Sequence, residues 1–270
     1  MDYAGGQAVI EGVLIRYKDK IAISVRKGNR IITKREKLEP KLLRKVFFIR
    51  GVFNLVEFLI LGMKALNWSA NQQLGKEEKL SNAQLTVALL FSLAFAIGLF
   101  IFLPFFATGL LGLEQGVIFN VVDGLIRLIV FVLYVFIISF MADIKRLFQY
   151  HGAEHKSINC YEAGKKLTVE NVKKYSTIHN RCGTTFIMIV LIVSIFVFSL
   201  ITGNFFYQLL ARIILIPVIA SLSYEILFFL NKFNLRLFLW PGLLVQKITT
   251  LEPDKKQIQV AIVAVKNALR

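Results

Sequence analysis

The pattern of apolar and polar residues divides the chain into a β-prone start and a series of long apolar helices. Short runs rich in β-branched residues come first, at 8–10, 13–15, 21–25 and 30–33. Gly28 and Asn29, just before the last run, have the composition of a turn. We therefore predict a small β-meander within residues 1–45, which is too short to be stable alone and is expected to pack on the rest of the protein.

Residues 46–67 predict an apolar helix with one charged face. Arg50, Glu57 and Lys64 recur every seven residues, so they lie near one side of such a helix. This pattern favours an amphipathic helix that lies in the membrane interface or re-enters the membrane. The alternative is a true span that is buried against other helices.

Four longer apolar segments follow, and each is long enough to cross a hydrocarbon core of about 30 Å. They cover roughly 85–107, 117–142, 184–202 and 205–230. The predicted fold is thus a mainly α, polytopic membrane protein with about four transmembrane helices. Residues 255–270 have the pattern of an amphipathic helix, and Pro241 and Pro253 are expected to break the segment before it.

Composition and charge add a membrane topology to this picture. Hydrophobic residues make up 56% of the chain and the mean hydropathy is +0.62, which is too high for an ordinary soluble domain. The net charge of +16 does not indicate a nucleic-acid partner, because lysine and arginine avoid the links 108–116 and 203–204 and gather in the other loops. Both termini and the segment 143–183 are therefore expected in the cytoplasm. No cleavable signal peptide is expected, since the first residues lack a basic region followed by an apolar run.

The predicted organisation has six parts. They are a cytosolic β-rich segment (1–45), an interfacial or re-entrant helix (46–67), a first transmembrane pair (85–142), a cytosolic His/Cys loop (143–183), a second transmembrane pair (184–230) and a cytosolic amphipathic tail (231–270). Transmembrane helices that have no face clearly suited to contact only lipid often associate with other copies of the protein. We therefore expect a homo-oligomer within the lipid bilayer.

Every histidine and cysteine of the chain, three and two residues respectively, falls between His151 and Cys182. His151 and His155 share one face of a helix, and with Glu154 they match H-x-x-E-H, the inverted zinc-peptidase pattern in which the glutamate is the general base. His179 and Cys182 form a second pair at a spacing of three. We predict that these two pairs bind a divalent metal, with zinc favoured by the donor types.

Two interpretations of this cluster stay open. A catalytic site keeps one coordination position open, whereas four protein ligands close a structural zinc site. Further candidates are Cys160 and Glu162. Cys160 could otherwise be a small packed residue, and Glu154 could be an exposed charge on the helix. Glu225 lies about 20 residues into the last span, and at 1.5 Å per residue it returns to the cytosolic boundary near the two pairs. A cytosolic location also favours reduced thiols over a disulfide.

Besides Glu225, three charged residues fall inside the predicted spans: Asp123, Arg127 and Arg212. Charges at membrane depth are costly and usually face protein or water. Asp123 and Arg212 are expected at similar depths, so the simpler interpretation is an ion pair that joins two helices. The alternative is an intramembrane polar pathway for an ion or a substrate.

Several stretches resemble the bacterial YqhQ family, a family of unknown function. The matching stretches are GGQAVIEGV (5–13), YHGAEHK (150–156), NCYE (159–162), HNRCGT (179–184), SYE (223–225), PGL (241–243) and TTLEPD (249–254). Asn180 stands where a proline is common in the family. The resemblance implies a multi-span protein of the bacterial plasma membrane, often labelled a metal-dependent enzyme, and it adds Gln7, Glu11 and Arg16 to the candidate region.

The leading hypothesis is a metal-dependent hydrolase with a cytosol-facing site that acts on a membrane-associated substrate, such as a lipid or a membrane peptide. The alternative is an oligomeric channel, transporter or scaffold in which the His/Cys cluster is a structural staple or a gate. The intramembrane charges favour the alternative, whereas the position of Glu154 between two histidines favours the hydrolase.

Overall fold

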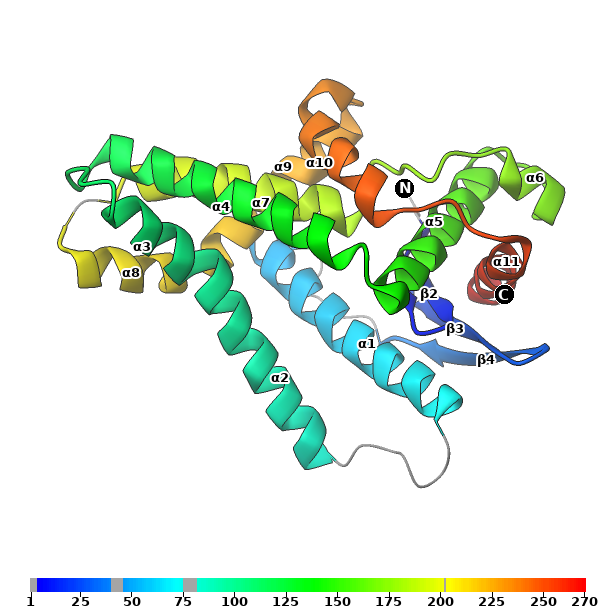
Figure 1. The fold of residues 1–270 in the computed structure, drawn as a ribbon. Coiled ribbons are helices and arrows are strands. Elements are labelled where there is room, and N and C mark those ends of the chain that lie inside the picture. Colours follow the sequence, from blue (N-terminus) through cyan, green and yellow to red (C-terminus); the bar gives the residue numbers. More distant parts are fainter. Residues whose placement is uncertain (1–3, 40–45, 75–81, 202) are drawn as a thin grey trace.

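The computed structural model describes residues 4–39, 46–74, 82–201 and 203–270, in which a small sheet is enclosed by helices beside a body of apolar helices (Figure 1). The strands are β1 (Ala4–Val9), β2 (Gly12–Tyr17), β3 (Lys20–Lys27) and β4 (Arg30–Lys37). The helices are α1 (Ile49–Gln73), α2 (Asn82–Ile97), the π-helical turn η3 (Gly98–Phe102), α3 (Leu103–Gly109), α4 (Val117–Ile138), α5 (Ala142–Glu162), α6 (Val169–Lys173), α7 (Gly183–Ser199), α8 (Phe205–Ile214), α9 (Ile216–Lys232), α10 (Arg236–Thr249) and α11 (Lys255–Leu269). The ends of the predicted β segment, 1–3 and 40–45, lie outside the described residues, as do residues 75–81 between the predicted helix 46–67 and the first predicted span.

The four strands form an antiparallel meander in the order β1-β2-β3-β4, which confirms the predicted amino-terminal unit. Each connection has two residues, since Val9 pairs with Gly12 across the first turn and Lys27 pairs with Arg30 across the last. Gly28 has a φ of 57°, which a glycine adopts without steric cost, so the turn falls where the sequence predicts it.

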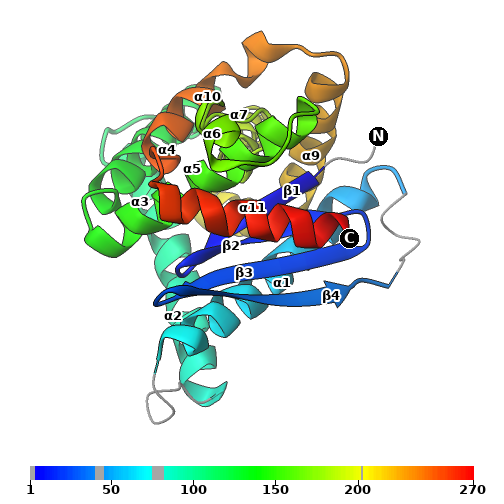
Figure 2. The same ribbon diagram turned by 90° about the vertical axis from the view of Figure 1, so that its right-hand side faces the viewer.

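Both faces of the sheet are covered, because side chains alternate between them along each strand. On β2, Val13 and Ile15 face α5 and α11, whereas Leu14 faces α1. Helix α11 lies across one face while α1 lies behind the other (Figure 2). The meander is therefore the middle layer of a helix–sheet–helix unit, and this explains how so small a sheet is stable.

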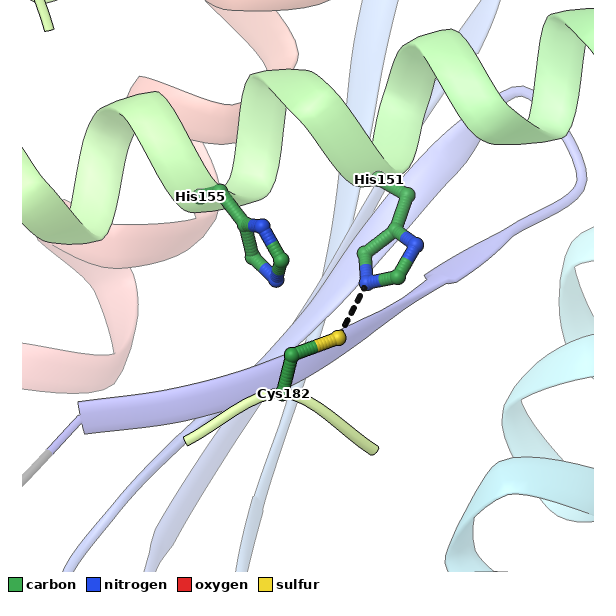
Figure 3. A group of neighbouring side chains, drawn as sticks. All are labelled: His151, His155 and Cys182. Atoms are coloured by element: carbon green, nitrogen blue, oxygen red, sulfur yellow. Dashed lines mark hydrogen bonds between the residues drawn. The ribbon is translucent and has the colours of Figure 1, made fainter. Parts of the chain in front are cut away.

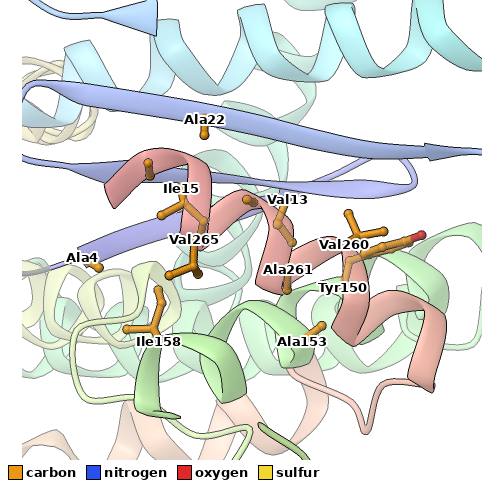
Figure 4. Packing of buried hydrophobic residues seen from close by; sticks show 12 residues of the cluster. Ala4, Val13, Ile15, Ala22, Tyr150, Ala153, Ile158, Val260, Ala261 and Val265 are labelled. Atoms are coloured by element: carbon orange, nitrogen blue, oxygen red, sulfur yellow. The ribbon is translucent and has the colours of Figure 1, made fainter. Parts of the chain in front are cut away.

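Helix α11 comes close to the sheet through small side chains. The buried core on this face contains Ala261, Ala264 and Ala268 together with Val260 and Val265 (Figure 4). Asp254 begins the helix with a capping box, in which its carboxylate accepts the amide of Gln257 and its own amide donates to the Gln257 side chain. The predicted helix over 255–270 is confirmed, and it belongs to the sheet unit rather than to a free tail.

Two helical runs are long and apolar enough to cross a membrane. They are Thr86–Gly109, formed by α2, η3 and α3, and Val117–Ile138, which is α4. Helices α8 and α9 pass the same test only together, and they are bent by 49° at their junction. Helix α7 is apolar but only 17 residues long. The described residues thus contain two candidate spans, or three if the bent pair counts as one, where the sequence pattern predicted about four.

The segment 143–183 is largely helical, and α5 buries polar and small side chains that give no apolar signal in the sequence. One other expectation differs from the structure. Pro241 does not break the chain but lies inside α10, five residues after the helix begins. At that place its missing amide leaves only the carbonyl of Leu237 without an intrahelical partner.

Gly152 allows the backbone before α11 to lie directly on α5. A Cβ at this position would overlap the carbonyl oxygen of Leu251, and the Leu251 amide donates to the carbonyl of Phe148 at 3.0 Å. Any side chain at Gly152 must therefore push the connection between α10 and α11 away from α5.

We predict that Gly152→Ala destabilises the protein by about 1–3 kcal/mol, as expected for an overpacked contact. The measurement is the thermal unfolding temperature of the full chain in detergent. The matched control is Gly109→Ala, because no heavy atom lies within 4 Å of a Cβ built there. Equal unfolding temperatures for the two variants would contradict this account of the α5 contact.

Candidate metal centre

Three of the four predicted ligands meet at one point. His151 and His155 project from one face of α5 toward Cys182, the residue that precedes α7 (Figure 3). One ligand atom of each residue lies within 4.8 Å of the others. The spacing of four on a helix therefore places the two imidazoles together, as the sequence predicts.

Backbone carbonyls fix the orientation of both imidazole rings. Nδ1 of His151 lies 2.9 Å from the carbonyl oxygen of Thr249, and Nδ1 of His155 lies 2.5 Å from that of Thr177. A carbonyl only accepts, so each Nδ1 carries the ring proton and each Nε2 keeps its lone pair. Metal-binding histidines commonly have this second interaction, which sets the tautomer and the direction of the free nitrogen.

The donor types, and the one short distance between ligand atoms, suit a transition metal such as zinc. Sγ of Cys182 lies 3.3 Å from Nε2 of His151. Two ligands of a tetrahedral zinc ion, at the usual Zn–S and Zn–N lengths, lie roughly 3.5 Å apart. Sγ also accepts the amide of Thr184 at 3.4 Å at the start of α7, where a helix favours negative charge. Burial lowers the pKa of His155 against the opposing influence of the Cys182 thiol, so the ring tends to stay neutral, as a ligand must be.

His179, the fourth predicted ligand, lies beside this group but faces another partner. Its ring centroid is 5.6 Å from that of His155, and its Nε2 lies 3.4 Å from a carboxylate oxygen of Glu162. Glu162 also pairs with Arg181. Partial burial acts to raise the pKa of Glu162, but the hydrogen bonds and charges of His179 and Arg181 outweigh it and hold that pKa below its usual range. Among the described residues, the group that could hold a metal ion is therefore His151, His155 and Cys182, and His179 is not part of it.

Glu154 contributes a buried carboxylate next to the ligands. Its side chain is 3% exposed, and its Oε2 has no hydrogen-bond partner among the described residues. Burial raises the pKa of Glu154, while the charges of His151 and His179 act to lower it. An unpaired buried carboxylate oxygen costs free energy, so this position is not explained by stability.

The cluster opens into a pocket of about 920 Å³. His151, Glu154, His155 and Cys182 line one part of it. Residues from β1, β2, α1 and α9 line the rest, and these include Gly6, Arg16, Phe58 and Phe228. The sheet, the metal ligands and an apolar helix therefore share one cavity, whose size is at the upper end for small-molecule sites.

Two amides hold the segment that carries Thr177 and His179. The Gln246 side chain accepts the amide of His179 and donates to its carbonyl, both at 2.9 Å. Asn159 donates to the carbonyls of Ser176 and Ile178. Sequence reasoning did not identify Gln246 as part of the site, and an uncharged glutamine in an amphipathic segment gives no signal for such a role.

The remaining candidates from the sequence lie elsewhere. Cys160 is buried in a small apolar core, where burial raises its thiol pKa. Glu11 pairs with Arg146, Gln7 packs against Gly62 of α1, Arg16 pairs with Glu57 and Glu225 pairs with Arg50. Of these residues, Arg16 lines the pocket.

The charges inside the apolar helices form one network, in which Oδ1 of Asp123 and Nε of both arginines have no hydrogen-bond partner in the part of the chain that the structure describes. Asp123 of α4 binds Arg127 at 2.5 Å and Arg212 of α8 at 3.3 Å. The ring of Phe105 packs on the Arg212 guanidinium, and that of Phe198 packs on both guanidinium groups. The pair between Asp123 and Arg212 joins two helices, as the simpler interpretation of the sequence predicts.

Comparison with known proteins places the chain in a family. A family described as "Protein of unknown function (DUF1385)" matches residues 46–270. A protein of Bacillus subtilis (strain 168) described as "Uncharacterized protein YqhQ" is 36% identical, and the match covers 98% of this chain and 92% of that protein. The chain belongs to the YqhQ family. No solved structure matches it, so the YqhQ family assignment rests on sequence and confirms the resemblance drawn from the motifs.

We predict that the purified protein contains about one transition-metal ion per chain and that Cys182→Ser loses most of it, since a serine oxygen is a poor ligand for zinc. Cys160→Ser is the matched control, because that thiol lies in the apolar core instead of the cluster. The measurement is elemental analysis of protein purified without chelators. Equal metal content in the two folded variants would contradict the assigned ligands.

Proposed function

We propose that this protein is a metal-dependent hydrolase that acts on a membrane-associated substrate. The observation that carries the proposal is the unpaired, buried carboxylate of Glu154 beside a three-ligand cluster with a fourth position open. A closed structural zinc site uses four protein ligands and has no need of a base. A hydrolytic site needs both an open position and a base within reach of water.

Each residue has a defined part in this chemistry. A divalent ion held by the cluster would polarise a substrate carbonyl or phosphoryl oxygen and lower the pKa of a water molecule. Glu154 would accept the proton of the attacking water and return it to the leaving group. Thr249 and Thr177 act through their carbonyls, which keep Nε2 of each histidine directed at the ion.

We also propose a multi-pass location in the plasma membrane, with the site at the cytoplasmic surface. Besides the candidate spans, α1 supports this location with a row of exposed apolar side chains opposite its contact with the sheet: Val56, Leu59, Ile60, Met63 and Leu66. Such a row suits a helix that lies in the membrane interface. The charge distribution supports the cytoplasmic side.

We predict that Glu154→Gln keeps the metal but lowers hydrolysis by about 100-fold or more, the usual contribution of a general base. The measurement is product release from phospholipid vesicles and from a labelled membrane peptide, with metal content determined on the same samples. Glu170→Gln is the control, since that carboxylate is exposed at the start of α6 and does not line the pocket. Full activity of the metal-loaded Glu154→Gln protein would exclude the assigned base.

The second candidate function is an oligomeric channel, transporter or scaffold, and the buried charges of α4 and α8 favour it. The contacts of these charges nevertheless suit a fixed link between helices better than a pathway for ions. Aromatic rings pack on both arginines and Asp123 lies between them, an arrangement that suits a fixed link between helices.

We therefore predict no ion flux through liposomes that contain the wild-type protein and no gain or loss in Arg127→Leu. A dye-based flux assay with a known channel as positive control makes the measurement. Flux in the wild type that is lost in Arg127→Leu would favour the polar pathway instead.

A further inference from the structure

We propose that the pocket beside the metal ligands binds an anionic amphiphile, with a phosphate-type headgroup at its cationic end and an apolar chain along α1 and α9. This inference rests on the proposed function for the identity of the substrate site, but the binding it describes does not require hydrolysis. It follows from the chemistry of the pocket lining.

The polar part of the lining is cationic. Arg16, Lys18, Arg181 and Lys232 all line the pocket, and Glu154 is the acidic residue among the lining side chains of the described chain. They come from separate elements: the end of β2, the turn after it, the segment before α7 and the end of α9. Four cations that converge from distant parts of the sequence on one cavity provide strong attraction for an anionic group.

Two of these cations are held in place from outside the cavity. Arg16 binds Glu57 of α1 at 3.0 Å, and Arg181 binds Glu162 of α5. Lys18 lies at a φ of 56° in the two-residue turn between β2 and β3, so its position is set by the meander. Guanidinium groups with fixed direction favour phosphate, which accepts hydrogen bonds from several donors at once.

The opposite part of the pocket lining is apolar and comes from helices with exposed apolar side chains. Phe58 of α1 and Leu227 and Phe228 of α9 line the pocket. The Phe228 side chain is 46% exposed, and Leu59 beside Phe58 belongs to the exposed apolar row of α1. The apolar wall thus continues onto surfaces that suit the membrane interface, and a chain could enter along them.

The two parts together select the ligand class. A free anion would use the cations but leave the apolar wall in water, and a neutral lipid would bring no negative charge to the cationic end. A volume of about 920 Å³ exceeds what a phosphate ion fills and suits a headgroup with part of a chain. The three metal ligands lie in the same lining, so the bound headgroup comes next to the proposed reaction centre.

The test uses the full chain in nonionic detergent as Glu154→Gln, so that binding is measured without turnover. Three probes are titrated by calorimetry: dihexanoyl phosphatidic acid, dihexanoyl phosphatidylcholine and inorganic phosphate. We expect phosphatidic acid to bind at least about tenfold more tightly than either of the others, because only it engages both parts of the pocket. Equal affinity for phosphatidylcholine, or for inorganic phosphate, would overturn the proposal.

Variants locate the binding. Lys18→Gln with Lys232→Gln is expected to weaken phosphatidic acid binding about 30-fold, since each lysine near a lipid surface contributes about fivefold. Lys255→Gln with Lys266→Gln on exposed positions of α11 is the matched control and is expected to bind normally. Phe58→Ala should weaken phosphatidic acid but not inorganic phosphate. Equal binding by the two lysine pairs would place the ligand outside this pocket and overturn the proposal.

The result of the binding test can be distinguished from the result of the hydrolysis test of the proposed function. Tight binding of phosphatidic acid without hydrolysis of any substrate by the wild type would contradict the hydrolase and support the anionic pocket. Hydrolysis of a membrane peptide or a neutral ester without phosphatidic acid binding would support the hydrolase and contradict the anionic pocket.

Discussion

The direct contact between α5 and the chain that joins α10 to α11 is the constraint on which the site depends. The carbonyl of Thr249 accepts a hydrogen bond from Nδ1 of His151. Two residues later, the amide of Leu251 donates to the carbonyl of Phe148 on α5. The same connection then leads into α11, which closes one face of the sheet. One backbone-to-backbone contact, made possible by Gly152, therefore positions both a metal ligand and the helix that completes the core.

The site also links the sheet unit to the apolar helices. The apolar helices supply Cys182 at the start of α7, whereas α5 supplies the histidines and packs on the sheet. The candidate site thus lies where the sheet unit meets the apolar helices. Gln246 of α10 adds a second link, because it bonds the backbone of His179 and the hydroxyl of Thr185 on α7. A site built on several rigid elements keeps its geometry better than one on a single loop.

The sequence was most informative where a local rule acts alone. Alternation and two-residue turns predicted the meander, and a spacing of four placed His151 beside His155. Sequence reasoning failed where the partner is distant or is backbone. No side-chain pattern shows that the carbonyls of residues 177 and 249 orient the imidazoles. The helical rise predicted how deep Glu225 lies but not its partner. Arg50 of α1 donates to both oxygens of the Glu225 carboxylate.

The partners of His179 and Glu154 decide how the cluster is best interpreted. If His179 completed a closed zinc site, its Nε2 would point at the ion, but it lies beside Glu162 instead. Leaving a buried polar atom unpaired costs about 1–3 kcal/mol, and Glu154 has such an atom. An apolar residue at that position would remove this cost without changing the three candidate ligands. The buried, unpaired carboxylate oxygen of Glu154 therefore supports the proposed role in proton transfer better than it supports a purely structural cluster.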